Sequence, residues 1–169
     1  MTAPDVTRPR PPLIAGEREM LDAWLDFHRA TLVHKCAGLT VEQLRERACP
    51  PSSLSLLGLV RHMTDVERGW FTGFAGGDRT KRYSSPDNPD GDFDDVDGAD
   101  PQEAFAAFAE ECDTSRSLVA GRDLDETYVH WRGEEISLRW IYVHMIEEYA
   151  RHNGHADLLR ERIDGTVGA

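Results

Sequence analysis

Residues 138–159 read LRWIYVHMIEEYARHNGHADLL, and their apolar positions recur with the period of a helix. Ser137 precedes the stretch and is a typical N-terminal cap, whereas Gly165 is a typical residue at a helix end. The apolar side of the predicted helix is formed by Ile141, Met145 and Tyr149. A long helix with one apolar side must bury that side against other elements.

Further helices are expected upstream of this stretch. The apolar spacing and the capping residues predict long helices at about 15–37, from Ser53 or Ser55 to Phe74, and at 101–121, with a short helix at 40–48. Residues 127–131 are expected to form a short extended segment. Four long amphipathic helices joined by one long crossover predict an all-α protein with the architecture of a four-helix bundle.

The crossover is the acidic segment 77–100, which contains eight Asp residues together with Arg79, Lys81 and Arg82. This composition is too polar to pack well, so we expect a long acidic loop. It could be a solvated connection between helices or a lid over a site. Residues 1–14 are rich in proline and are expected to form a flexible N-terminal arm. The bundle domain is expected to span residues 15–166.

The composition excludes several classes of protein. The chain has 169 residues, with 19 Lys+Arg against 31 Asp+Glu and a net charge of −12. This charge opposes nucleic-acid binding, which depends on basic side chains that neutralise phosphates. The apolar runs are too short to cross a membrane. We therefore expect neither nucleic acid nor a membrane among the partners.

The cysteines and the N-terminus favour a cytoplasmic protein. Cys36, Cys49 and Cys112 are odd in number and widely spaced, which is typical neither of a disulfide framework nor of a thiolate zinc site. Cys36 and Cys112 lie among apolar neighbours and are expected to be inert. Residues 1–12 lack the apolar core of a signal peptide.

Ionisable residues on the last helix are the main candidates for chemistry. His144, Glu148, His152 and His155 follow one another at intervals of four, four and three residues, so they share one side of the helix. That side continues the apolar line, and buried charge is costly unless it is paired or binds a metal. Imidazole and carboxylate groups are ligands for zinc, nickel or iron. The same spacing also fits a plain surface pair of Glu148 with His152.

A third ligand would have to come from another helix. His62 is the candidate, because it lies at the edge of the apolar side of the helix that ends near Phe74. A surface or hydrogen-bonded histidine is an equally simple interpretation. Asp65 and Glu67 follow closely and either orient a ligand imidazole or face the solvent. Arg139 and Arg151 are interpreted either as partners of an anionic substrate or as surface residues.

The segments Leu59–Met63 (LVRHM) and His144–Asp157 (HMIEEYARHNGHAD) together resemble the DinB/YfiT-like superfamily. The resemblance extends over about Gly16–Gly165 and is greatest to an actinobacterial branch similar to mycothiol-dependent maleylpyruvate isomerase. Many superfamily members carry His-x-x-x-His-x-Gly-Gln, whereas this chain has Glu148 in the first position and His155 in the last. The glutamate matches the isomerase branch, whose metal ligands are His, Glu and His.

This resemblance implies a four-helix bundle that holds a divalent metal, zinc or nickel, through His62, Glu148 and His152. It leaves His144 and His155 one turn on either side, with roles in hydrogen bonding to the ligands or in core packing, although His155 could also approach an enlarged coordination sphere. It further implies a homodimer.

The implied function is a metal-dependent enzyme that activates a low-molecular-weight thiol such as mycothiol. The reaction would be S-transfer to a small-molecule substrate or an isomerisation. The alternative is a metal-binding bundle without catalysis, with a role in stress response or sensing. It predicts a closed coordination sphere, whereas the enzyme requires an open position.

Overall fold

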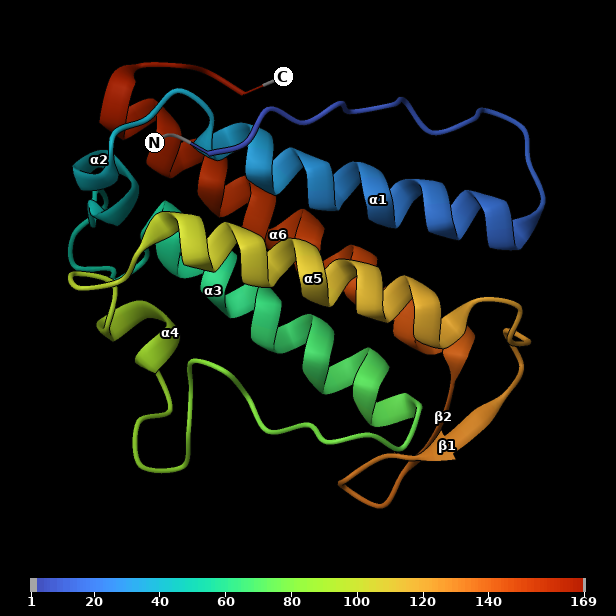
Figure 1. Cartoon of the computed structure of the whole chain (residues 1–169). Helices are drawn as coiled ribbons and strands as arrows, with labels where there is room; N and C mark the ends of the chain where they lie inside the picture. The colour runs from blue at the N-terminus through green and yellow to red at the C-terminus, as the bar shows by residue number, and fades with distance from the viewer. Residues whose placement is uncertain (1–2, 169) are drawn as a thin grey trace.

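The computed structural model of the chain describes residues 3–168 and is shown in Figure 1. This part of the chain is mostly helical, and its only sheet has two strands. The expectation of an all-α protein is therefore confirmed. Within the same residues, no helix combines the length and the apolar character that crossing a bilayer requires.

In chain order the helices are α1 (Glu17–Cys36), α2 (Val41–Arg45), α3 (Leu56–Glu67), η1 (Arg68–Thr72), α4 (Gly91–Asp94), α5 (Pro101–Val119) and α6 (Leu138–Asp164). The four long helices and α2 begin and end close to the predicted positions, whereas α4 lies within the segment that was expected to be a loop. Ser55 and Ser137 cap α3 and α6, because each side chain accepts a hydrogen bond from a backbone N–H of the first turn. Gly165 ends α6 in the left-handed conformation, at φ 79°.

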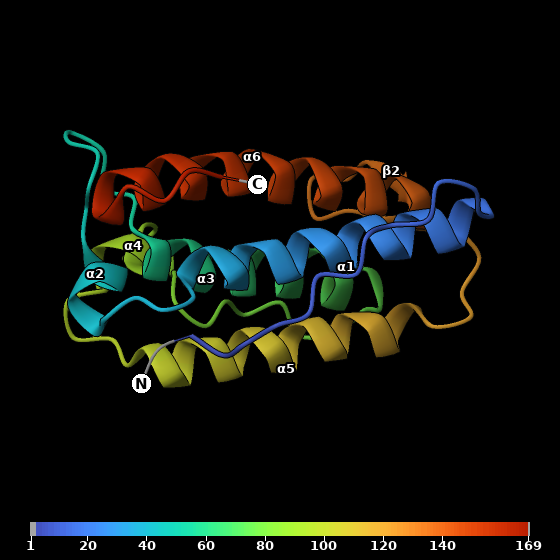
Figure 2. The same cartoon turned by 90° about the horizontal axis from the view of Figure 1, so that it is seen from above.

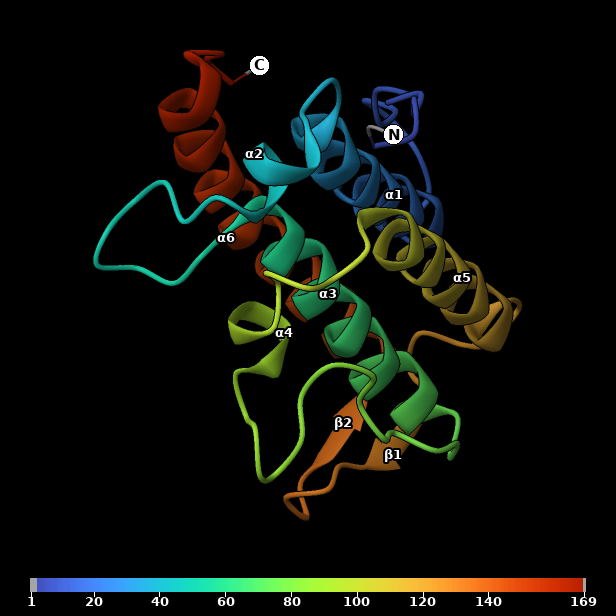
Figure 3. The same cartoon turned by 60° about the vertical axis from the view of Figure 1, so that its left-hand side comes forward.

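The long helices α1, α3, α5 and α6 lie side by side (Figures 1 and 3). α1 packs along α6, α3 packs along α5, and α3 also contacts α6. The core between them includes Leu32, Leu59, Met63, Met145 and Tyr149, none of which has exposed surface. Because α3 and α6 are neighbours, side chains from both can reach one site.

The segment at the end of α3 differs from the predicted uninterrupted helix. The chain stays helical to Phe74, but Arg68–Thr72 form the π-helix η1. A π turn has i→i+5 hydrogen bonds and often occurs at functional sites. The residue pattern contains no feature that predicts it.

A β-hairpin precedes α6. Its strands β1 (Thr127–Val129) and β2 (Glu135–Ser137) are antiparallel, with Tyr128 opposite Ile136. The first strand lies within the predicted extended segment, whereas the second was not predicted. Gly133 has φ +85° in the connecting turn, a conformation that favours glycine. The turn carries His130 and Trp131.

The acidic segment 77–100 packs more closely than its composition predicts. The carboxylate of Asp65 on α3 accepts backbone N–H groups from Arg82 and Ser84, at 2.7 and 3.0 Å. The Arg61 guanidinium donates to the carbonyls of Gly91 and Asp92, which holds α4 on α3. Most of the segment is exposed, as its composition predicts, but buried groups on α3 bind its backbone at residues 82–84 and 91–92 and hold these parts against the bundle.

The N-terminal residues follow an extended path along α1 and α5 (Figure 2). Ala3 and Pro11 are buried. The chain from 3 to 16 thus covers part of the helical surface.

Candidate metal centre

His62 on α3 is held by a carboxylate from the acidic segment. Its Nδ1 lies 2.7 Å from Oδ2 of Asp92, which is only 4% exposed. Asp92 is placed there because Arg61 fixes the backbone of α4. A carboxylate that accepts the N–H at Nδ1 leaves the lone pair on Nε2, which is the arrangement typical of metal-binding histidines.

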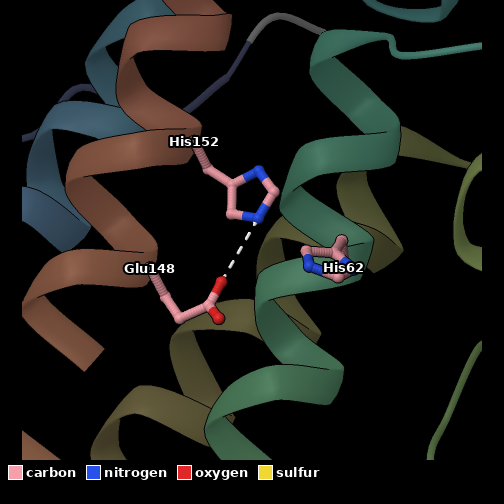
Figure 4. Close-up of side chains that lie close together, drawn as sticks. All are labelled: His62, Glu148 and His152. Carbon is pink, nitrogen blue, oxygen red and sulfur yellow. Dashed lines mark ion pairs between the residues drawn. The ribbon is translucent and has the colours of Figure 1, made fainter. Parts of the chain in front are cut away.

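Glu148 and His152 extend from α6 toward α3 (Figure 4). They are one helical turn apart, and His152 Nε2 lies 3.5 Å from Glu148 Oε2. His62 approaches from α3, with its ring centroid 4.7 Å from that of His152. One donor atom from each of the three side chains lies within 4.8 Å of the other two. The structure therefore brings together the three residues that the sequence suggested as ligands, and we call them the three-donor cluster.

The donor set suits a divalent ion. Burial, with smaller contributions from His62 and His155, lowers the pKa of His152 to about 4. His152 is therefore neutral at physiological pH and has a lone pair to donate. Atoms that share zinc or nickel at about 2.1 Å are at most about 4.2 Å apart, so small side-chain rotations would close the cluster around an ion. The three residues fit the metal that the resemblance implies.

His144 and His155 flank the three-donor cluster. His144 Nε2 is 3.5 Å from Glu148 Oε1, and His155 Nδ1 is 3.4 Å from His152 Nδ1. Each therefore contacts one member of the cluster. Within residues 3–168, the donor group that contains His62 includes Glu148 and His152 but not His155.

Asp65 and Glu67 neither face the solvent nor orient His62. Asp65 is 1% exposed and binds the backbone of residues 82–84, while Glu67 is fully buried. The carboxylate that does contact His62 is Asp92, which the sequence analysis missed. Asp92 is one of eight Asp residues in its segment, and no feature of the sequence distinguishes it from the others.

A second group of ionisable residues lies in the core. Arg29 on α1 donates two hydrogen bonds to the carboxylate of Glu67, both at 2.7 Å. The hydroxyl of Tyr149 on α6 donates to the same carboxylate at 2.7 Å. This buried network, Arg29–Glu67–Tyr149, joins α1, α3 and α6. Burial opposes the charge of Arg29, but the carboxylate of Glu67 outweighs this effect and raises the pKa of the arginine well above its ordinary value. Burial also raises the pKa of Tyr149 well above 10.0.

The cysteines and two candidate arginines have ordinary structural roles. Burial raises the pKa of Cys36 to about 12 and raises that of Cys112 as well, so neither thiol forms a thiolate at neutral pH. Arg139 forms ion pairs with Glu17 and Asp125, and Arg151 pairs with Glu147. These arginines are paired at the surface.

Comparisons with known proteins identify the family. A search of curated proteins finds no match. A search of solved structures finds none either. The family model described as Mycothiol-S-transferase matches residues 20–165, a range that includes α3, α6 and all three members of the cluster. The chain therefore belongs to the mycothiol S-transferase family, within the DinB/YfiT-like superfamily.

Proposed function

We propose that this protein is a metal-dependent thiol S-transferase whose zinc or nickel ion is bound by His62, Glu148 and His152. The observation that carries the proposal is the convergence of these donors within 4.8 Å, in a chain that matches the transferase family over residues 20–165. The fold proposed for it is the DinB-like four-helix bundle, formed by α1, α3, α5 and α6 within residues 15–166.

A divalent ion bound here would stabilise the anionic form of a coordinated thiol and so lower its pKa. Three protein ligands leave room for such a thiol. The cluster supplies one formal negative charge, from Glu148, so the site stays electrophilic when loaded.

The surrounding side chains hold the ligands in position. Asp92 fixes the ring of His62 through Nδ1, and His155 contacts His152 at its Nδ1. Both contacts involve Nδ1, so the Nε2 atoms of His62 and His152 remain available to bind the ion. Ligand imidazoles oriented in this way bind metal more tightly.

The family name points to mycothiol as the thiol. In the proposed transfer, the thiol loses its proton to solvent, and its sulfur forms a bond to an electrophilic atom of a small molecule. The electron pair of the bond that breaks leaves with the departing group. Cys36 and Cys112 take no part, because burial keeps both protonated.

Two further expectations belong to the proposal. The protein works as a homodimer, and it resides in the cytoplasm. Light scattering of the purified protein checks the first of these.

Elemental analysis of the untagged protein tests the metal site. We expect about one zinc or nickel ion per chain. His152→Ala should lose it while keeping its circular dichroism spectrum, and Glu148→Gln should weaken binding because it removes the ligand charge. Metal retained at full occupancy in both His62→Ala and His152→Ala would disprove the site.

Activity separates the enzyme from the non-catalytic alternative. The metal-loaded protein should transfer mycothiol to electrophilic small molecules, and the His152→Ala variant should not. A protein that binds the ion but transfers no thiol to any electrophile would support the sensing bundle instead.

A further inference from the structure

A group of aromatic rings lies beside the three-donor cluster, and the proposed metal-dependent thiol transfer does not use it. It consists of Trp70 on η1, His130 and Trp131 in the hairpin turn, and Trp140 and His144 on α6, and we call it the aromatic wall. It contains three of the four tryptophans of the chain. Such a concentration in one place calls for a physical reason.

Trp70 is the centre of the wall. Its ring centroid lies 4.5 Å from that of His144 and 5.2 Å from that of His130, on which it stacks. Trp131 and Trp140 are 5.0 and 5.3 Å from it. Rings from three separate segments of the chain, η1, the hairpin and α6, thus meet at Trp70.

The wall is not a buried core. Trp131 is 47% exposed and Trp140 is 45% exposed, so two indole rings offer much of their surface to the solvent. Aromatic rings that gather at the surface in this way are typical of binding sites. His130 adds a polar feature: its side chain is 5% exposed, yet Nε2 has no hydrogen-bond partner among the described residues.

The wall is continuous with the three-donor cluster. His144 stacks on Trp140 with centroids 4.8 Å apart, and its Nε2 is 3.5 Å from Glu148. Trp140, His144, Glu148 and His152 follow one another at four-residue intervals along α6. A helix rises 1.5 Å per residue, so Trp140 lies about 12 Å along the axis from Glu148.

Its chemistry suits a particular part of the thiol. Mycothiol carries its cysteinyl group on two linked cyclic polyols, whose C–H bonds form flat, weakly polar faces. Such faces pack on the electron-rich face of an indole, while the hydroxyl groups at the ring edges need hydrogen-bond partners. The span from the wall to the cluster is comparable with the reach from the rings to the sulfur.

We propose that the aromatic wall binds the cyclic polyol portion of the thiol, while the sulfur reaches the three-donor cluster. This inference rests on the proposed function, since it takes the thiol from there. It assigns Trp140 and Trp131 as the platform for the rings.

The probe for the test is mycothiol methylated on its sulfur, which keeps the rings but cannot form a thiolate. We expect this compound to bind the wild-type protein and to change its tryptophan fluorescence in a saturable way. Calorimetry then gives the affinity of each variant. Trp140→Ala and Trp131→Ala should each weaken binding about tenfold, the scale of one lost aromatic contact. The zinc affinity of both variants should equal that of the wild type.

Trp24→Ala is the matched control, because Trp24 is 41% exposed on α1 and is not part of the wall. It should bind the methylated probe with unchanged affinity. S-methyl-N-acetylcysteine, which lacks the rings, should not bind measurably. Wild-type affinity of the probe for both Trp140→Ala and Trp131→Ala, with their folds intact, would overturn the inference.

Failure of the wall and failure of the proposed function give different results. If the protein binds no zinc, but binds the methylated probe with an affinity that depends on Trp140, the binding role of the wall is supported and the metal site is disproved. If zinc binds and thiol transfer proceeds, while the tryptophan variants bind the probe with wild-type affinity, the binding role of the wall is disproved and the proposed function is supported. His152→Ala should lose zinc and keep its affinity for the probe.

Discussion

Glu148 and Tyr149 are adjacent on α6, yet they belong to two very different groups of ionisable side chains. Glu148 is part of the three-donor cluster, where its closest imidazole contacts are at 3.5 Å and every member is partly exposed. Tyr149 is part of the buried Arg29–Glu67–Tyr149 network, where the hydrogen bonds are 2.7 Å long.

The two groups differ in how far hydrogen bonds within the protein satisfy their polar atoms. In the buried network, both oxygens of Glu67 accept hydrogen bonds from other helices, so the protein itself already satisfies this fully buried carboxylate. In the three-donor cluster, the contacts are longer than hydrogen bonds, and the donor atoms remain available. The same two helices, α3 and α6, therefore carry both the buried network, which connects the helices, and the three-donor cluster, whose atoms are free to bind a ligand.

Removing the central carboxylate of the network should have the largest effect. Glu67→Ala removes the buried carboxylate that pairs with Arg29 and leaves this arginine only the partly exposed Asp26, at 2.9 Å. Breaking a buried ion pair typically costs about 3–5 kcal/mol. We expect a large drop in the urea concentration at the midpoint of unfolding.

Glu110→Ala is the control, since this helical glutamate has a side chain that is 76% exposed. It should change the free energy of unfolding by less than about 0.5 kcal/mol. An equally small change for Glu67→Ala would mean that the network is not a structural connection.

Removing the support of His62 should have an intermediate effect that is confined to the cluster. Asp92→Ala should weaken zinc binding about 10- to 100-fold, the usual cost of losing a carboxylate that orients a ligand imidazole. Asp92→Asn should recover part of the affinity, because its side-chain oxygen can still accept from His62. Competition with a chelating dye measures the affinities.

Asp94→Ala provides the comparison within the same short helix, because this residue is exposed. Its zinc affinity should match that of the wild type. If Asp92→Ala also matched the wild type, His62 would not depend on the acidic segment.

The interior should also respond to alkaline pH, by about 1.4 kcal/mol per pH unit for each buried acid. Burial raises the pKa of Cys36 from 9.0 to about 12, and burial with a bond to Asp22 raises that of Tyr142 above 10.0. The unfolded chain releases these protons first, so it binds fewer protons than the folded protein, and stability falls as the pH rises from 9 toward 12. Below pH 9 this contribution is complete.

Urea unfolding at pH 8, 9, 10 and 11 checks this sign. Cys36→Ala should flatten the decline above pH 9, and His152→Ala should leave it unchanged, because the cluster lies outside the core. A stability that is constant up to pH 11 would contradict the prediction.

The sequence was sufficient for features that depend on local chemistry. Ser55 and Ser137 cap their helices because a hydroxyl accepts from the first turn, and Gly165 ends α6 because it tolerates a positive φ. The three-donor cluster was predicted from the four-residue interval between Glu148 and His152 and from the place of His62 at the edge of an apolar helix side, and the family resemblance supported all three residues.

Contacts between segments that are distant in the sequence could not be predicted. Asp92 reaches His62 only because α4 docks on α3, and the pairing of Glu67 with Arg29 joins residues 38 positions apart. Neither contact produces a pattern that can be recognised in the spacing of residues along the sequence. The packing of parts of the acidic segment was missed for the same reason, since their backbone is bound by Asp65 and Arg61, far from them in the chain.

The π turn at the end of α3 alters the rotational phase of that helix. Trp70 comes eight residues after His62, and on an uninterrupted α-helix it would be displaced by about 80° around the axis. Each residue of a π turn advances less around the axis than a residue of an α-helix, so η1 reduces this displacement. His62 contacts His152 and Trp70 contacts His144, and these two histidines lie on one side of α6. The continuous helical segment can therefore present a metal ligand and an indole ring to a single bound molecule.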